Sequence, residues 1–127
     1  MLFRSIVMAA AWLEIIVGVV LVAAPDLLCV LLFAMKPEGV GVSLARFAGV
    51  GLLGLGIAGL PSTATGSRQG VVGLFAFNVG VAILLVWVGV TTVHGPLLWP
   101  VVILHAAIAI ALTPQLLITK GQIAEGA

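Results

Sequence analysis

The stretch SIVMAAAWLEIIVGVVLVAA, residues 5–24, contains a single charged side chain, that of Glu14. Because an α-helix rises about 1.5 Å per residue, roughly 20 apolar residues cross the roughly 30 Å of hydrocarbon in a bilayer. The stretch is therefore predicted to form a helix that spans a membrane. Glu14 lies near the middle of that helix, so the role of a carboxyl group at this depth is the first question about the protein.

The composition of the whole chain also indicates a membrane protein. The 127 residues are 63% apolar and 7% charged, whereas soluble domains have about 25% charged residues. The formal net charge is +1 and the five basic residues are scattered, so no surface for nucleic acid is expected. The chain has one cysteine, Cys29, which cannot form an intrachain disulfide, and neither a metal site nor a cofactor is predicted.

Three further apolar segments are long enough to cross a bilayer, and they cover residues 40–60, 70–90 and 97–118. Polar, turn-forming sequences separate the segments: KPEG, PSTATGSRQG and TTVHGP, residues 36–39, 61–70 and 91–96. The predicted fold class is therefore all-α, an integral membrane four-helix bundle. Residues 1–127 are predicted to form a single four-span transmembrane domain.

The segment PDLLCVLLFAMKPEG, residues 25–39, lies between the first two predicted spans. Its apolar part is too short to cross a bilayer, and it is bracketed by Asp26, a good N-cap residue, and by Pro37, which ends helices. We expect a short helix at or near the membrane interface. The alternative is a lid or re-entrant element over a cavity.

The basic residues near the ends of the spans predict an orientation. Arg4, Arg68 and Lys120 fall on one side of the predicted bundle, and only Lys36 falls on the other. Cytoplasmic loops carry an excess of Lys and Arg. Both termini are therefore expected in the cytoplasm.

The second predicted span is rich in glycine, and small residues let membrane helices approach closely. Gly49 and Gly56 are seven residues apart and so lie on one stripe of the helix. Packing within the chain is the favoured interpretation of this stripe. The alternative is a seam between copies, which would make the protein a homo-oligomer through this helix.

Each predicted span carries one strongly polar side chain well inside it, namely Glu14, Arg46, Asn78 and His105. In antiparallel spans these residues fall roughly 15, 9, 18 and 12 Å below the outer boundary, which places them in one layer. A charged side chain at mid-helix costs about 2.5 to 3.5 kcal/mol. Glu14 and Arg46 are therefore predicted to face the interior of the bundle.

Two interpretations of this layer remain open. In the first, Glu14 and Arg46 form a buried ion pair that Asn78 and His105 brace, and the layer is structural. In the second, the four side chains line a polar pocket that binds a ligand or an ion. The small residues Ala10, Ala11 and Gly18 on the face of Glu14 favour the second interpretation, because they leave room beside the carboxyl group.

The favoured function is binding or transport of an ion or a small amphipathic or lipid-soluble molecule. The protein is also expected to contact membrane lipid. Glu14, Arg46, Asn78 and His105 are the predicted binding residues. The first alternative is a structural or accessory membrane subunit. A membrane enzyme acting on a lipid-soluble substrate comes third, because no nucleophile or metal site accompanies Glu14 and His105.

The sequences LEIIVGVVLVAAP in the first span and LARFAGVGLLGLGIAGLP in the second resemble small four-helix bacterial inner-membrane proteins of the DoxX-like kind. This resemblance covers most of the chain and implies the same location and the same number of spans. Members of that group mostly have no assigned activity.

The sequence LEIIVG around Glu14 is similar to the first helix of the small multidrug resistance transporters. That resemblance implies a dimer built around a membrane-embedded Glu. The chain departs from this family in its third span, where LFAFNVG lacks the family's Trp and Gly pattern, and Arg46 and His105 have no counterpart there.

Overall fold

The computed structural model describes residues 2–60 and 68–124. Within these ranges the chain is all-helical and has no strand, which confirms the all-α part of the predicted fold class. The helices are α1 (Leu2–Ala23), α2 (Pro25–Phe33), α3 (Val40–Gly59), α4 (Arg68–Thr91) and α5 (Leu98–Ala124). Residues 61–67 of the predicted polar turn PSTATGSRQG lie outside the described residues. The side chains of Arg68 and Lys120, on which the predicted orientation partly depends, are also outside the described part.

In the described part of the chain, three helices are long and apolar enough to cross a membrane. These candidate spans are Arg4–Ala23, Val40–Gly59 and Gln69–Thr91. They agree within a few residues with the first three predicted spans. The apolar part of α5, Leu98–Pro114, is shorter, so the fourth span stays a prediction.

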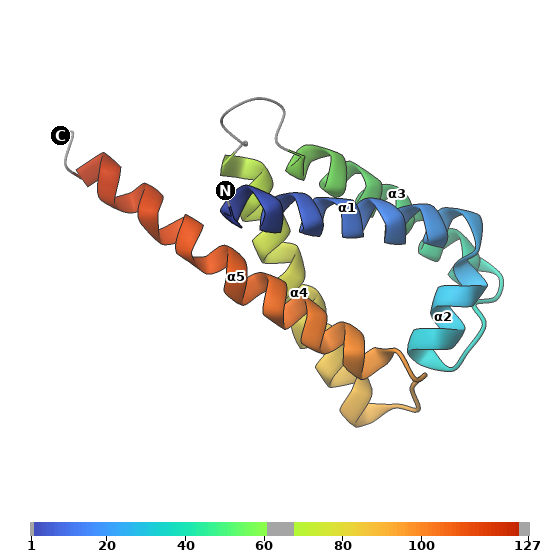
Figure 1. The fold of residues 1–127 in the computed structure, drawn as a ribbon. Coiled ribbons are helices and arrows are strands. Elements are labelled where there is room, and N and C mark those ends of the chain that lie inside the picture. The colour runs from blue at the N-terminus through green and yellow to red at the C-terminus, as the bar shows by residue number, and fades with distance from the viewer. Residues whose placement is uncertain (1, 61–67, 125–127) are drawn as a thin grey trace.

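The four long helices are arranged as two antiparallel pairs. Helix α1 packs along α3, and α4 packs along α5. Figure 1 shows that the pairs approach each other near the start of α1 and diverge toward its end, where α2 lies across the gap. The result is a splayed arrangement with one closed end and one wide end.

The closed end is held by an apolar core to which α1, α4 and α5 all contribute. Ala10, Ala11, Leu74 and Leu112 are almost completely buried there, and Leu55 of α3 packs against them. Full burial of such side chains contributes about 1.5 to 3 kcal/mol for each large aliphatic residue. This core joins the two helix pairs at the closed end.

Helices α1 and α3 touch backbone to backbone. A Cβ atom on Gly18 would lie 2.8 Å from the carbonyl oxygen of Gly49, and a Cβ atom on Gly49 would lie 2.8 Å from that of Gly18. About two turns farther along α3, a Cβ atom on Gly56 would lie 2.7 Å from the carbonyl oxygen of Ala11. The stripe of Gly49 and Gly56 therefore packs within the chain, as the favoured interpretation predicts.

The same contacts correct the prediction about Ala10, Ala11 and Gly18. These residues do not provide the space beside Glu14, because α3 covers Gly18 and Ala11, and Ala10 belongs to the apolar core. Small side chains here bring helices together, which is their usual role in membrane proteins.

Helix α2 differs in detail from the prediction. Asp26 is not its N-cap, because the helix begins at Pro25 and its N-cap is Ala24, which makes no side-chain cap hydrogen bond. Pro25 takes the first helical position, where its missing N–H costs nothing. The helix ends before Pro37, at Phe33, because Ala34 adopts the left-handed conformation with φ 55°.

The C-terminal end of α2 is tied to the connector between α4 and α5. The backbone N–H of Gly95 donates to the carbonyl oxygen of Leu32 at 2.9 Å, and that of Leu97 donates to Leu31 at 3.0 Å. These bonds satisfy carbonyl groups that a helix end leaves unpaired. They also fix α2 between the two helix pairs, so that it closes the wide end.

Candidate ligand-binding cavity

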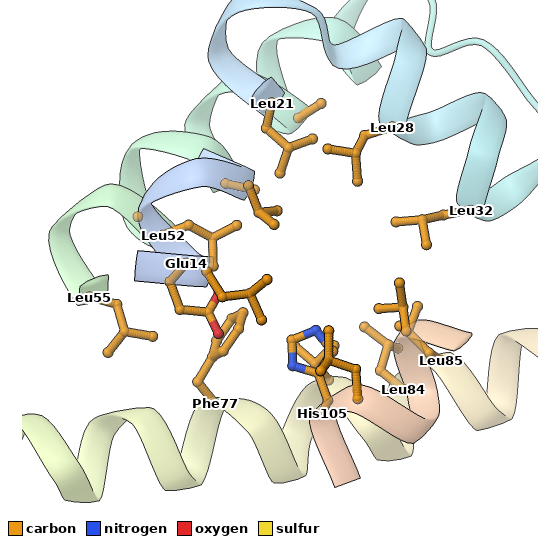
Figure 2. A pocket seen from close by; sticks show the side chains of 18 of the residues that line it. Glu14, Leu21, Leu28, Leu32, Leu52, Leu55, Phe77, Leu84, Leu85 and His105 are labelled. Carbon is orange, nitrogen blue, oxygen red and sulfur yellow. The ribbon is translucent and has the colours of Figure 1, made fainter. Parts of the chain in front are cut away.

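A cavity of about 600 Å³ lies between the two helix pairs and α2. All five helices contribute to its wall, and most of the lining side chains are aliphatic. Figure 2 shows Glu14, Phe77 and His105 close to one another, with Leu28 and Leu32 of α2 across the cavity from them. The volume is in the range of small-molecule sites, about 300 to 1,000 Å³.

The Glu14 side chain lines this cavity and is 1% exposed. Its Oε1 atom is buried and has no hydrogen-bond partner. A buried polar atom that lacks a partner costs about 1 to 3 kcal/mol, and a charged one costs more. Glu14 thus presents an unused hydrogen-bonding atom in an apolar space.

Asn78 lies behind the cavity wall and is fully buried. Its Nδ2 donates to the backbone carbonyl oxygen of Leu74 at 2.8 Å. A carbonyl oxygen only accepts hydrogen bonds, so this contact fixes which end of the amide is nitrogen. The side-chain oxygen of Asn78 must then face the other way, toward His105.

The imidazole of His105 is held by that oxygen. Its Nδ1 lies 2.7 Å from Oδ1 of Asn78, and because the oxygen accepts, Nδ1 is the donor. In the neutral imidazole the other nitrogen, Nε2, is then an acceptor. The Phe77 ring packs edge-on against the imidazole, with ring centroids 6.0 Å apart, and so fixes the plane of the ring.

The amide of Asn78 also interacts with the carboxyl group of Glu14. Its Nδ2 has two N–H groups and uses one for Leu74, so the second is available to the carboxyl group. His105 therefore donates a hydrogen bond to Asn78, and Asn78 in turn offers an N–H group to Glu14. This polarity leaves His105 Nε2 and Glu14 Oε1 as the atoms of the cluster that remain for a ligand.

Arg46 does not join this cluster. Its side chain is exposed, and in the described part of the chain Glu14 makes no ion pair with it. The prediction that Arg46 faces the interior is therefore wrong, and the ion pair of the first interpretation does not form among the described residues. Of the predicted layer, the structure brings Glu14, Asn78 and His105 together and places Arg46 outside.

The reason for the position of Arg46 is the rotation of α3. Successive residues of a helix are about 100° apart, so Arg46 lies about 60° to one side of Gly49 and Leu52 about 60° to the other. Gly49 faces α1. Leu52 then falls on the cavity side of α3 and lines the cavity, whereas Arg46 falls on the outer side.

Helix α2 also contributes to the cavity, which the favoured interpretation of residues 25–39 as an interfacial helix did not predict. Its side chains Leu28, Cys29, Leu32 and Phe33 all line the cavity, so α2 forms a wall, as a lid over a cavity would. The signal for this was the short length of the apolar segment, which suggested a lid or re-entrant element as the alternative. In the part of the chain that is described, no three His, Cys, Asp or Glu side chains are grouped so that they could hold a metal ion.

Comparison with known proteins gives no relative from which a role could be transferred. The chain matches no protein-family model, no curated protein and no solved structure.

Proposed function

We propose that this protein is an integral membrane protein with four spans and both termini in the cytoplasm, and that its cavity binds a small amphipathic or lipid-soluble molecule. The resemblance to DoxX-like proteins suggests the bacterial inner membrane as its location. Binding is the central part of this proposal, and transport would be an additional step.

The outer faces of the long helices support the membrane location. Large apolar side chains are exposed on every one of them, including Ile16 (58%), Phe47 (78%), Ile83 (66%) and Ile103 (68%). Soluble proteins rarely expose so much contiguous apolar surface. Lipid chains are the natural cover for these faces.

The antiparallel packing of α5 on α4 supports the fourth span. Helix α4 contains the candidate span Gln69–Thr91, and α5 returns along it with the apolar segment Leu98–Pro114. A helix packed along a spanning helix shares its depth. At about 1.5 Å per residue, this segment covers most of the hydrocarbon thickness.

The observation that carries the binding proposal is the unpartnered Oε1 of Glu14 in the wall of an apolar cavity of about 600 Å³. Buried polar atoms in proteins almost always have partners. An apolar molecule with one polar group would fill the space and supply the missing partner. A bare metal ion is a poorer candidate, because such ions need several oxygen or nitrogen ligands.

The alternative of an accessory subunit depended on a layer in which Glu14 and Arg46 satisfy each other. Arg46 is exposed, and Glu14 keeps an unpartnered oxygen. A carboxyl group that serves only to hold helices together would be expected to have a partner within the protein. Binding is therefore the better supported function.

The binding proposal can be tested through Cys29, the single cysteine of the chain, which lines the cavity. The full chain in lipid nanodiscs would be treated with N-phenylmaleimide, a small apolar thiol reagent. The rate of Cys29 modification would be measured with and without n-decanol or n-decylamine. Both decyl compounds are expected to slow the reaction because their chains occupy the cavity.

Two glycines of α3 provide a matched pair of variants. Gly51 lines the cavity, Gly54 does not, and a Cβ atom on either meets no other atom within 4 Å. Gly51→Phe should fill the cavity and remove protection of Cys29, whereas Gly54→Phe should keep it. The proposal fails if neither decyl compound protects the parent protein, or if protection is the same in both variants.

A further inference from the structure

We propose that the molecule bound in this cavity is a lipophilic primary amine, whose ammonium group donates hydrogen bonds to Glu14 Oε1 and His105 Nε2. This inference rests on the proposed binding function and adds the chemical class of the ligand. It follows from the direction of the hydrogen bonds in the cluster, the charges around the cavity and the character of its wall.

The direction of the hydrogen bonds favours a ligand that donates hydrogen bonds. Leu74 fixes the Asn78 amide, the amide fixes Nδ1 of His105 as the donor, and Nε2 is then an acceptor. The second N–H of Asn78 is available to the Glu14 carboxyl group, with which this side chain interacts. An ionised carboxylate is an acceptor only, and the positive charge of a bound ammonium group would favour that ionised form. Beside such an ammonium group, the free atoms Glu14 Oε1 and His105 Nε2 would both accept hydrogen bonds.

The charges around the cavity favour a cationic ligand. None of the described residues in its wall is Lys or Arg, and Arg46 is exposed on the outer side of α3. A carboxylate in an apolar space is costly unless it is paired. An ammonium group would neutralise Glu14 and provide three N–H donors, enough for both free acceptors.

The rest of the wall requires an apolar body on the same ligand. Apart from Glu14, Cys29 and His105, the described lining residues are aliphatic, aromatic or glycine. Leu28 and Leu32 of α2 stand across the cavity from Glu14 and His105, as Figure 2 shows. A hydrocarbon chain or ring system attached to the ammonium group would fill this space and bury its apolar surface.

Four probes built on a ten-carbon chain separate these requirements. They are n-decylamine, decyltrimethylammonium, n-decanol and decanoic acid, tested near neutral pH for protection of Cys29 in nanodiscs. The primary amine should protect at a concentration about tenfold or more below that of n-decanol, because hydrogen bonds to a charged group are stronger than neutral ones. The trimethylammonium ion has the charge without an N–H group and should be weaker than the amine by a similar factor. Decanoic acid should protect least.

The variant Glu14→Gln keeps the shape of the side chain and removes its charge. It should lose the preference for n-decylamine, so that the amine and n-decanol protect Cys29 at similar concentrations. Protection by n-decanol should fall by a smaller factor than protection by n-decylamine, and the control Gly54→Phe, which lies outside the cavity, should keep the amine preference of the parent protein. His105→Phe should lower the affinity for the amine by a larger factor than the affinity for n-decanol.

The outcomes distinguish this inference from the binding function on which it rests. If n-decanol, decyltrimethylammonium or decanoic acid protects as well as n-decylamine in the parent protein, and Gly51→Phe removes protection, the cavity binds apolar molecules but the amine assignment is wrong. An amine preference that survives in Glu14→Gln also overturns the assignment. If none of the four probes protects, the binding function itself fails.

Discussion

Oδ1 of Asn78 lies 2.7 Å from Nδ1 of His105, and this contact joins α4 to α5 at the wall of the cavity. Both residues are buried, and His105 lines the cavity while Asn78 stands behind it. Asn78 thus sets the donor and acceptor character of a histidine that it holds in place. The same amide interacts with Glu14, so one residue of α4 connects the polar groups contributed by α1 and α5.

Replacing Asn78 with Leu should destabilise the fold. The change leaves the Nδ1–H of His105 buried without an acceptor, which costs about 1 to 3 kcal/mol. Unfolding of the purified protein in mixed micelles would measure the loss. Thr113→Val is the control, because the Thr113 hydroxyl only bonds the carbonyl oxygen of Ala109 in its own helix. Equal stability of the two variants would contradict the assigned role of Asn78.

Replacing Arg46 with Ala should change the free energy of unfolding by less than about 0.5 kcal/mol, as is usual for exposed positions. Removing one partner of a buried ion pair would instead cost about 3 to 5 kcal/mol. The same unfolding measurement separates these values. A loss in the larger range would show that Arg46 pairs with a buried carboxylate after all.

Replacing Gly49 with Ala should weaken the contact between α1 and α3. The new Cβ atom would lie 2.8 Å from the carbonyl oxygen of Gly18, so the helices must move apart at a cost of about 1 to 3 kcal/mol. Gly54→Ala is the matched control, since its Cβ atom meets nothing within 4 Å and alanine favours a helix by about 0.5 to 1 kcal/mol over glycine. The two variants should therefore shift the unfolding midpoint in opposite directions, and a shift in the same direction would count against this packing.

The reactivity of Cys29 should depend on pH in a specific way. Cys29 lies in the short helix α2, where burial and, to a smaller degree, the carboxylate of Asp26 raise the pKa of its thiol. The thiolate is the reactive form, so at a given pH Cys29 should react with a maleimide more slowly than an ordinary cysteine. The rate should keep rising at pH values above the usual thiol range.

The variant Asp26→Asn removes the like charge and should move that pH profile to lower values, with faster modification near neutral pH. Glu38→Gln removes a carboxylate from the next connector and serves as the control, with no expected shift. Rates of maleimide modification across a pH series would measure both. Identical profiles for Asp26→Asn and the parent protein would exclude Asp26 as a cause.

The predicted orientation can be tested with reporter fusions. Fusions that end near residue 68 and at the C-terminus should report a cytoplasmic location, and a fusion near Lys36 should report the opposite side of the membrane. Arg4, Arg68 and Lys120 outnumber Lys36 on the predicted cytoplasmic side. A single location for the fusions near Lys36 and Arg68 would overturn the topology.

Much of the fold could be predicted from the sequence because the relevant signals are local. Apolar length sets where a spanning helix is possible, and Gly, Pro and polar residues mark where it ends. The bounds of α1, α3 and α4 therefore came out within a few residues. The shared depth of Glu14, Asn78 and His105 also follows from counting residues along each helix, and these three side chains do come together.

Only the tertiary structure decided the rotation of each helix about its own axis, and so which of its faces lines the cavity. Gly18, Gly49 and Gly56 allow α1 and α3 to touch, and that contact sets the rotation of α3 about its axis. The sequence alone cannot tell which flank of the glycine stripe faces α4 and α5, because that depends on where the second helix pair packs. For this reason Leu52 lines the cavity and Arg46 does not. The depth of a residue is a property of its own helix, whereas its partner is determined by the packing of all the helices.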